Sequence, residues 1–440
     1  MSEVDTSSAV SVNQNYLDKV MDLAQVMDVE ATEDIFDARG VKLIGKGAKI
    51  SPALQEKLIM HKLRKPLEAC LMVDGGVNND NLLAEARRIA ETNRPILQVL
   101  CLASGKGASP FDILGGLRLG NAMSMMLTII ERGGNAALTH AIAVSLISFS
   151  LANKCGVSRD VQESIMLAGL LHDIGELYIA PEFLNPKRQL RPNEWHHIVV
   201  HPKISQMLIT ELGGFPPLVA QAAADHHERL NGTGYPRQLS GQAFAMPGQI
   251  LSVAEMISGI FLDQTRALER AELALKVIPG EHAPVLVSAI SGALRGRAGE
   301  EAIADMDGET SRSKSAIEGA RDLAGHIATL RQTGHALLDD KQVHSKRGVV
   351  LLNQTLDRIA MIERAFIATG MDPDMINDPA MAGDLGFIFE ASVVTREIGW
   401  RLRDVARDLS LNTASFDPRE TSFVDRFIDT IDAQTPDGPQ

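Results

Sequence analysis

The stretch "ADHHERLNGTGYP" at residues 224–236 sets two histidines side by side, with a carboxylate at each end of the pair. A sharp turn follows them, through Gly232, Gly234 and Pro236. Such a stretch suits either a helix end with a polar cap or a metal site. The choice between these two readings depends on the rest of the chain.

Other polar positions interrupt apolar, helix-like segments of the chain. His140 lies inside an apolar helix, His172-Asp173 ends the run "MLAGLLHDIG", His201 precedes a proline, and Glu255 interrupts "GQILSVAEMISGIF". A charged side chain after an apolar run is costly to bury without a partner. Each position alone is ordinary, since a lone histidine on an apolar face is more often a core residue. Together, imidazoles and carboxylates predict a site for iron, manganese or zinc.

Adjacent histidines restrict the geometry of such a site. Neighbouring residues on a helix diverge by about 100°, so His226 and His227 cannot both face one flat partner. They can border a cluster of two ions, with one side chain reaching each ion or each side of one. The two oxygens of Asp173 allow it to bridge two ions.

The composition favours helices and argues against several functions. The chain has 440 residues, which predicts two or three domains. Aromatic residues make up only 4%, and the net charge of −13 argues against a nucleic-acid-binding surface. The scattered Cys70, Cys101 and Cys155 lack CxxC spacing, so no disulfide framework is expected. Without a signal-peptide pattern or a membrane-length apolar run, we expect a cytoplasmic protein with no membrane partner.

Three segments follow from the pattern of elements. Residues 1–118 predict a small α+β domain, with strand, turn and strand in "DIFDARGVKLIGKG" and helices in "SPALQEKLIMHKLRKPLE" and "NNDNLLAEARRIAETN". Residues 119–290 read as helix after helix. Residues 291–440 begin with a linker and continue as helices, and their tail "DAQTPDGPQ" is expected to be disordered. The fold class is therefore mainly α.

These motifs carry a resemblance to a known family. "LLHDIGE" resembles the defining motif of the HD superfamily of metal-dependent phosphohydrolases, and "HHERLNGTGYP" resembles the second signature of its HD-GYP subfamily. The resemblance covers residues 119–290 and implies an all-helical HD-type domain. It implies a bacterial cyclic di-GMP phosphodiesterase, which forms pGpG or GMP with a metal-activated hydroxide at a binuclear centre. Residues 34–67 also resemble a small domain that often precedes HD-GYP domains, with an unknown input signal.

The resemblance also implies roles for individual residues. Two divalent transition-metal ions, iron or manganese, would occupy the site, and Asp173 would be the bridging and catalytic carboxylate. One ion would be held by His140, His172, Asp173 and Glu255. The other would be held by Asp173, His201, His226 and His227. Tyr235 would lie at the substrate edge or at a partner surface.

Departures from the family pattern affect the substrate side of the site. Glu176 stands where the family usually has a lysine facing the phosphates, and Glu255 replaces a usual aspartate. The family's Arg-Pro-Tyr group is absent, and Arg266 or Arg270 could substitute for its arginine. Some members bind a third metal through a glutamate where this chain has Ala136, so two metals are expected.

Two other functions fit the same residues. The domain could bind metal or nucleotide as a weak or inactive scaffold, presenting Gly234-Tyr235-Pro236 to signalling partners such as diguanylate cyclase domains. It could instead hydrolyse another nucleotide or phosphoester. The apolar face from Ile317 to Leu330 suits either an intrachain core or the helix of a homodimer.

Overall fold

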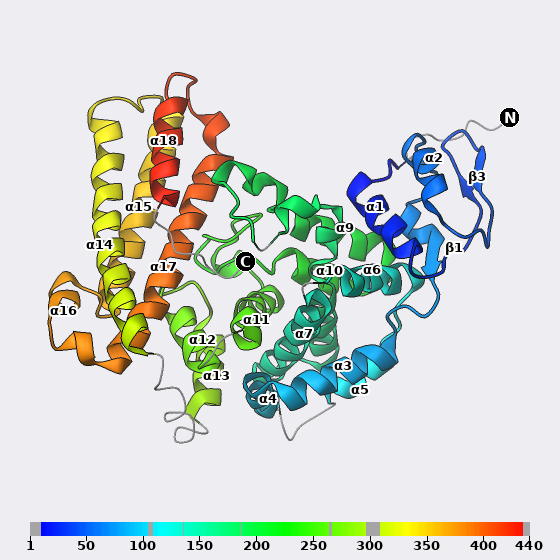
Figure 1. Cartoon of the computed structure of the whole chain (residues 1–440), viewed down its shortest axis with the longest axis horizontal. Helices are drawn as coiled ribbons and strands as arrows, with labels where there is room; N and C mark the ends of the chain where they lie inside the picture. The colour runs from blue at the N-terminus through cyan, green and yellow to red at the C-terminus, as the bar shows by residue number, and fades with distance from the viewer. Residues whose placement is uncertain are drawn as a thin grey trace. The chain divides into compact units, whose positions relative to one another are not determined.

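The computed structural model describes two compact units. It covers residues 10–103, 109–134, 136–185, 187–263, 266–295 and 309–433. Unit 1 comprises residues 1–185 and 198–263, and unit 2 comprises residues 186–197 and 264–440. Both units are mainly helical, which confirms the predicted fold class (Figure 1). The division into segments 1–118, 119–290 and 291–440 stays a prediction, and part of the expected linker and most of the expected disordered tail lie outside the described residues.

The N-terminal part of unit 1 combines one helix with two small antiparallel sheets. Helix α1 (Gln14–Ala24) begins after Asn13, whose side chain accepts a hydrogen bond from the amide of Tyr16. Strand β1 (Val29–Ala31) pairs with β4 (Leu71–Val73), and β2 (Ile35–Phe36) pairs with β3 (Lys42–Ile44). The predicted turn between β2 and β3 is present. Gly40 there has φ +84°, a conformation that favours glycine.

The helix predicted over residues 51–68 is wrong beyond Ile59. The segment forms a short 3-10 turn, η2 (Pro52–Leu54), then α2 (Gln55–Ile59), and after a gap η3 (Leu67–Cys70). Leu63 instead exchanges two backbone hydrogen bonds with Val10. Pro66, which has no amide hydrogen, precedes η3. Pairing with a distant extended segment therefore overrode the local helical preference.

The rest of unit 1 is a cluster of helices. Helix α3 (Asn79–Thr92) has a capping box at Asn78, and the predicted helices over the following sequence are present. The further helices are α4 (Arg94–Leu100), η4 (Cys101–Ala103), α5 (Pro110–Gly116), α6 (Asn121–Arg132), α7 (Ala137–Lys154), α8 (Arg159–Leu171), η5 (Ile174–Tyr178), η6 (Pro181–Phe183), α9 (His201–Leu212), α10 (Pro217–Ala224), η8 (Gly241–Ala243) and α11 (Met246–Asp263).

Helix α7 lies at the centre of this cluster. Every residue from Ala141 to Ala152 is buried, and α7 packs against both α8 and α11. A Cβ atom at Gly169 of α8 would lie only 2.9 Å from the Cα of Ser145 in α7, so the glycine permits close helix contact. Ser145 also donates a hydrogen bond to the carbonyl of Met166. This packing fixes α7 and α11, which carry His140 and Glu255, and α8, whose last residue directly precedes His172.

Helix length and composition give little support for a membrane span. Among the described residues, no single helix is both long and apolar enough to cross a bilayer. The bent pair of α5 and α6 passes the same test together, by length and composition only.

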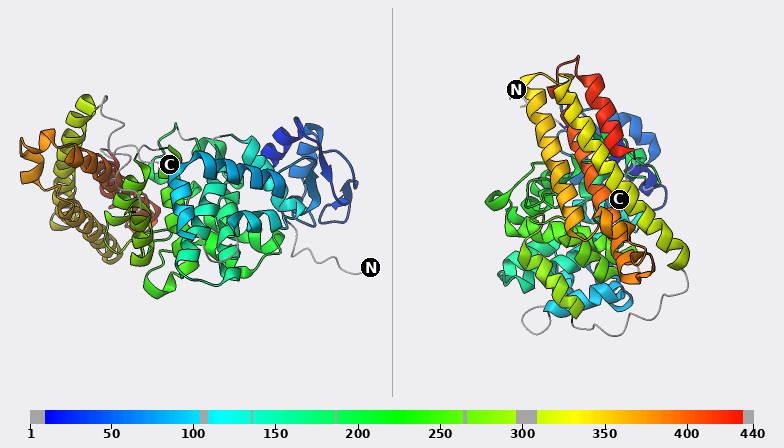
Figure 2. Two further views of the ribbon diagram at one scale, coloured as in Figure 1. Left: turned by 90° about the horizontal axis from the view of Figure 1, so that it is seen from below. Right: turned by 90° about the vertical axis from the view of Figure 1, so that its left-hand side faces the viewer.

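Unit 2 is built around three long helices and the shorter α18. Helices α14 (Glu309–Asp339), α15 (Lys346–Ala368), α17 (Leu385–Leu411) and α18 (Thr421–Asp432) lie alongside one another (Figures 1 and 2). The predicted apolar face of α14 is packed in their shared core, where Ile317, Ile327 and Leu330 are buried. The remaining elements are η7 (Pro192–His197), α12 (Ala267–Lys276), α13 (Pro284–Arg295), α16 (Pro373–Asn377), η9 (Met381–Gly383) and η10 (Thr413–Ser415).

One buried carboxylate ties the start of α15 to the start of α18. The side chain of Glu420 is 0% exposed. It accepts hydrogen bonds from the amides of His344 and Ser345, both at 2.6 Å, and from the amide of Asp417 at 3.0 Å. The Ser345 hydroxyl donates a further bond of 2.7 Å. Burial alone would raise the pKa of Glu420, but the hydrogen bonds from Ser345 and His344 hold it at about 2.

We expect Glu420→Gln to destabilise unit 2 by about 2 kcal/mol at pH 7, because hydrogen bonds to a charged acceptor are lost. The folded pKa is depressed, so the stabilisation is present above the ordinary value near 4.5 and is lost as the pH falls toward 2. Denaturant unfolding at several pH values measures the difference between the two proteins. The exposed Glu390→Gln is the matched control, and a Glu420→Gln difference that stays constant down to pH 2 would contradict the assignment.

Candidate metal centre

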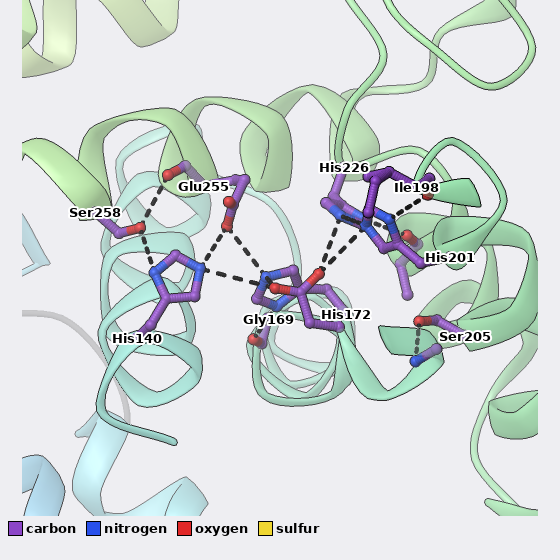
Figure 3. Close-up of polar contacts among 12 residues, drawn as sticks. His140, Gly169, His172, Ile198, His201, Ser205, His226, Glu255 and Ser258 are labelled. Carbon is purple, nitrogen blue, oxygen red and sulfur yellow. Dashed lines mark hydrogen bonds and ion pairs between the residues drawn. The ribbon is translucent and has the colours of Figure 1, made fainter. Parts of the chain in front are cut away.

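The seven residues predicted as metal ligands come together in unit 1. Their candidate ligand atoms form two sets, and within each set the atoms lie within 4.8 Å of one another. Figure 3 labels His140, His172, His201, His226 and Glu255 of this cluster and shows their side chains turned toward one another. The first set is His140, His172 and Glu255; the second is Asp173, His201, His226 and His227.

Both adjacent pairs lie where a helix has ended. His172 and Asp173 follow the last residue of α8, and His226 and His227 follow α10, which ends at Ala224. The 100° divergence expected inside a helix therefore does not apply to either pair. The rings of His226 and His227 lie 4.0 Å apart, centroid to centroid, and are inclined by 47°. A helix end thus lets two neighbours in sequence reach one cluster.

Backbone carbonyls set the orientation of three buried imidazoles. The Nδ1 atoms of His172, His201 and His226 each face a carbonyl oxygen in the preceding turn. A carbonyl only accepts hydrogen bonds, so each Nδ1 carries a proton and each Nε2 is directed at the cluster. The partners are Gly169 for His172 at 2.8 Å, Ile198 for His201 at 2.8 Å and Ala223 for His226 at 2.6 Å.

His140 is oriented by a side chain that the sequence analysis missed. The hydroxyl of Ser258 donates to the carbonyl of Glu255 at 2.8 Å, which leaves its oxygen to accept from Nδ1 of His140 at 3.2 Å. The Nε2 of His140 then faces the Glu255 carboxylate at 2.9 Å. Ser258 stands three residues after Glu255 on α11, a spacing that places both on one helix face.

The donor set fits metal ions. The Nε2 atoms of His201 and His226 lie 3.1 Å apart, although both are acceptors when their Nδ1 atoms are protonated. The Nε2 of His172 lies 2.9 Å from Asp173 Oδ2 and 3.1 Å from Glu255 Oε2. Acceptor atoms at these separations repel one another unless a cation or a proton lies between them. Neutral imidazole and carboxylate oxygen are ligands of iron, manganese and zinc.

Burial and neighbouring charges shift the pKa values of the cluster histidines in different directions. Burial lowers the pKa of His226 and His227, which favours the neutral imidazole that binds metal. Burial also opposes charge on His172, but Asp173 and Glu255 outweigh it and raise the pKa of that ring. Burial would raise the pKa of both carboxyls, yet the neighbouring histidines hold it well below the ordinary value. Asp173 and Glu255 are therefore ionised at neutral pH, as metal ligands must be.

Tyr235, predicted at the substrate edge, contacts the cluster directly. Its ring stacks on His227 with centroids 4.6 Å apart and an inclination of 25°, and its amide donates to the carbonyl of His227. A Cβ atom at Gly234 would lie 2.4 Å from the amide nitrogen of Arg229, so only glycine fits this tight loop. The loop thus places Tyr235 beside a candidate ligand.

The other two predicted substrate residues have different surroundings. Glu176 lies in η5, partly buried, and burial together with the charge of Asp173 raises its pKa to about 7. Arg266 belongs to unit 2, where its guanidinium packs 3.6 Å from the centre of the Phe389 ring and pairs with Glu269. The structure brings Glu176 near the cluster and assigns Arg266 contacts within its own unit. The substrate role of each stays a prediction.

Two carboxylates that hold the glycine-rich loop in place were also not predicted from the sequence. The Glu228 side chain is 0% exposed and accepts hydrogen bonds from the amides of Arg237, at 2.6 Å, and Leu239, at 2.8 Å. The guanidinium of Arg237 pairs with Asp225. The two carboxylates that flank the histidine pair therefore brace the loop. Their proximity to His226 and His227 was the only signal available in the sequence.

Comparison with known proteins identifies the domain that holds this cluster. A family model described as an HD domain matches residues 124–269, which contain all seven candidate ligands. Together with the HD and GYP motifs, this match decides the family. The chain carries an HD domain of the HD-GYP subfamily. Domains of this kind are metal-dependent phosphohydrolases, so the predicted family is confirmed.

Three curated relatives illustrate the similarity of this HD-GYP domain. The 3'3'-cGAMP-specific phosphodiesterase 1 of Vibrio cholerae is 30% identical over 31% of this chain and 31% of its own. A cyclic di-GMP phosphodiesterase of Pseudomonas aeruginosa is 27% identical over 34% of this chain and 36% of its own. The cyclic di-GMP phosphodiesterase of Thermotoga maritima is 30% identical over 34% and 42%. The matches thus span well under half the length of each relative.

We expect Asp173→Ala to remove most bound metal from the HD-GYP domain. Asp173 Oδ2 lies 2.9 Å from Nε2 of His172, and Oδ1 lies 3.4 Å from Nε2 of both His201 and His226, so one carboxylate faces both sets. Metal analysis of anaerobically purified protein should fall from about two ions per chain to about zero. The exposed Asp112→Ala should keep the wild-type content, whereas full metal content in Asp173→Ala would disprove the bridging role.

Proposed function

We propose that the chain is a cyclic di-GMP phosphodiesterase with a binuclear metal centre. The observation that carries this proposal is the convergence of five imidazoles and two carboxylates on one cluster, with Nε2 lone pairs facing inward. That the matched relatives are phosphodiesterases of cyclic dinucleotides supports the substrate class. The products are pGpG or, after a second cut, GMP.

The side chains of the site would have different roles in such a reaction. The two residue sets would hold one iron or manganese ion each, with Asp173 shared between them. When bound, the ions would polarise the phosphodiester and lower the pKa of a water molecule. Tyr235 offers an aromatic face beside His227 for a base or ribose. The metal charge would also offset the repulsion between an anionic nucleotide and a chain of net charge −13.

A direct turnover assay tests this proposal. The anaerobically purified chain, loaded with Mn²⁺ or Fe²⁺, is incubated with cyclic di-GMP and, separately, with 3'3'-cGAMP, and products are separated by chromatography. We expect linear product from cyclic di-GMP and none from metal-free protein or Asp173→Ala. If only 3'3'-cGAMP gave product, the substrate would be 3'3'-cGAMP and not cyclic di-GMP. A chain that holds two metals and turns over neither nucleotide would instead be a binding scaffold.

Glu176 offers a second test, because its charge opposes substrate phosphates. Above pH 7, where the Glu176 carboxyl is mainly ionised, Glu176→Lys replaces an anion beside Asp173 with a cation, so kcat/KM on cyclic di-GMP should rise by about fivefold to tenfold at low salt, with a smaller gain at high salt. The exposed Glu131→Lys makes the same charge change at the end of α6 and should leave kcat/KM unchanged. An unchanged or lower value for Glu176→Lys at every salt concentration would show that Glu176 does not face the phosphates.

A further inference from the structure

The short 3-10 helix η5 begins immediately after Asp173 and depends on side chains from outside the HD-GYP domain. Four successive carbonyls near its end accept hydrogen bonds from α1, more than one hundred residues before the matched segment. The ammonium of Lys19 donates to the carbonyls of Leu177 at 2.9 Å, Ile179 at 3.1 Å and Glu176 at 3.4 Å. The side-chain amide of Asn15 donates to the carbonyl of Tyr178 at 3.0 Å.

This arrangement is suited to stabilising a helix end. The last carbonyls of a helix have no partner within it, and a cation near them also interacts favourably with their dipoles. Lys19 is partly buried, so water screens its charge less than at an exposed site. Asn15 lies four residues earlier on α1 and therefore on the same helix face.

Aromatic contacts bind the same two elements together. The rings of Tyr16 in α1 and Tyr178 in η5 stack with centroids 5.3 Å apart and an inclination of 14°. The Tyr178 hydroxyl donates to the carboxylate of Glu68 in η3. Tyr16 is fully buried. The N-terminal segment thus holds η5 through its backbone and through a side chain.

On its other side, η5 packs against the helix that begins with His201. The amide of Gly175 donates to the hydroxyl of Ser205 in α9 at 2.9 Å. A Cβ atom at Gly175 would lie 2.3 Å from the carbonyl oxygen of His201 and 2.8 Å from the amide nitrogen of Ser205. No side chain fits there, so a shift of η5 away from α1 or toward α9 would move both Asp173 and His201.

We propose that Lys19 is a positioning residue of the metal centre: by holding the carbonyls of η5, it sets the places of Asp173 and His201. The inference rests on the proposed metal site. It implies that α1 contributes to metal binding by the HD-GYP domain. A change in the N-terminal segment would then alter metal affinity without touching a ligand. The simpler reading, in which Lys19 only adds stability, predicts no change in metal affinity of the folded protein.

The test uses the full chain and Lys19→Met, which removes the ammonium but keeps an unbranched side chain. The Mn²⁺ dissociation constant is measured by chelator competition without nucleotide, alongside hydrogen exchange of the 174–179 amides. We expect Mn²⁺ binding to weaken about tenfold, as it does when other residues that orient a metal ligand are replaced. The backbone amides of η5 should also exchange their hydrogens faster. On cyclic di-GMP, kcat should fall more than KM rises.

Three further variants make the outcome specific. Lys19→Arg keeps the charge and should restore Mn²⁺ affinity to within about threefold of wild type. Lys46→Met removes an equally charged, exposed side chain from the same segment and should change nothing. If Lys19→Met does not fold, Asn15→Ala removes a single bond to η5 and should weaken Mn²⁺ binding about threefold.

The proposal is overturned if the folded Lys19→Met protein, or Asn15→Ala in its place, binds Mn²⁺ within twofold of wild type. A lower melting temperature with unchanged affinity would assign these residues to stability alone. Because Mn²⁺ binding is measured without substrate, its result is separate from the proposed activity. A wild-type chain that binds Mn²⁺ but hydrolyses no nucleotide would contradict the proposed function and leave this test intact.

Discussion

The hydrogen bonds from histidine Nδ1 atoms to fixed oxygens are the constraint on which the candidate site depends. They fix the tautomers of His172, His201 and His226, and through Ser258 that of His140. Each bond turns an Nε2 lone pair toward the same small volume. The two Nε2 atoms of His201 and His226, 3.1 Å apart, are one pair that a cation or a proton between them would stabilise. The fold therefore brings the candidate ligands together before any ion is bound.

Close helix packing makes this geometry possible. Helix α7 is buried from Ala141 to Ala152, and Gly169 lets α8 approach its backbone. Rigid, closely packed helices hold side chains at their ends more precisely than loops would. The loop after His227 is fixed by different means, through the buried carboxylate of Glu228 and the pairing of Arg237 with Asp225. The site thus combines a packed apolar scaffold with a braced polar loop.

The 3-10 helix η5 joins these features to the N-terminal segment. It starts at the end of the HD motif, packs through Gly175 on α9, and offers its carbonyls to Lys19 and Asn15. A 3-10 helix of five residues has few internal hydrogen bonds and depends on its neighbours for a fixed position. The hydrogen bonds of Lys19 and Asn15 therefore connect α1 to the element that directly follows Asp173.

The sequence by itself determined the helical class and the identity of the candidate ligands. The pattern of elements predicted a helix over residues 78–93 and a run of helices over residues 119–290, and polar residues within apolar runs marked His140, Asp173 and Glu255, because burial of such groups demands partners. Only the tertiary structure decided that Leu63 pairs with Val10, that Ser258 orients His140, and that Lys19 holds η5. These contacts join residues far apart in the chain through one to three hydrogen bonds each, which leave no periodic pattern. Spacing along the sequence indicates which face of a helix or strand a residue occupies. It does not indicate which distant atom the side chain contacts.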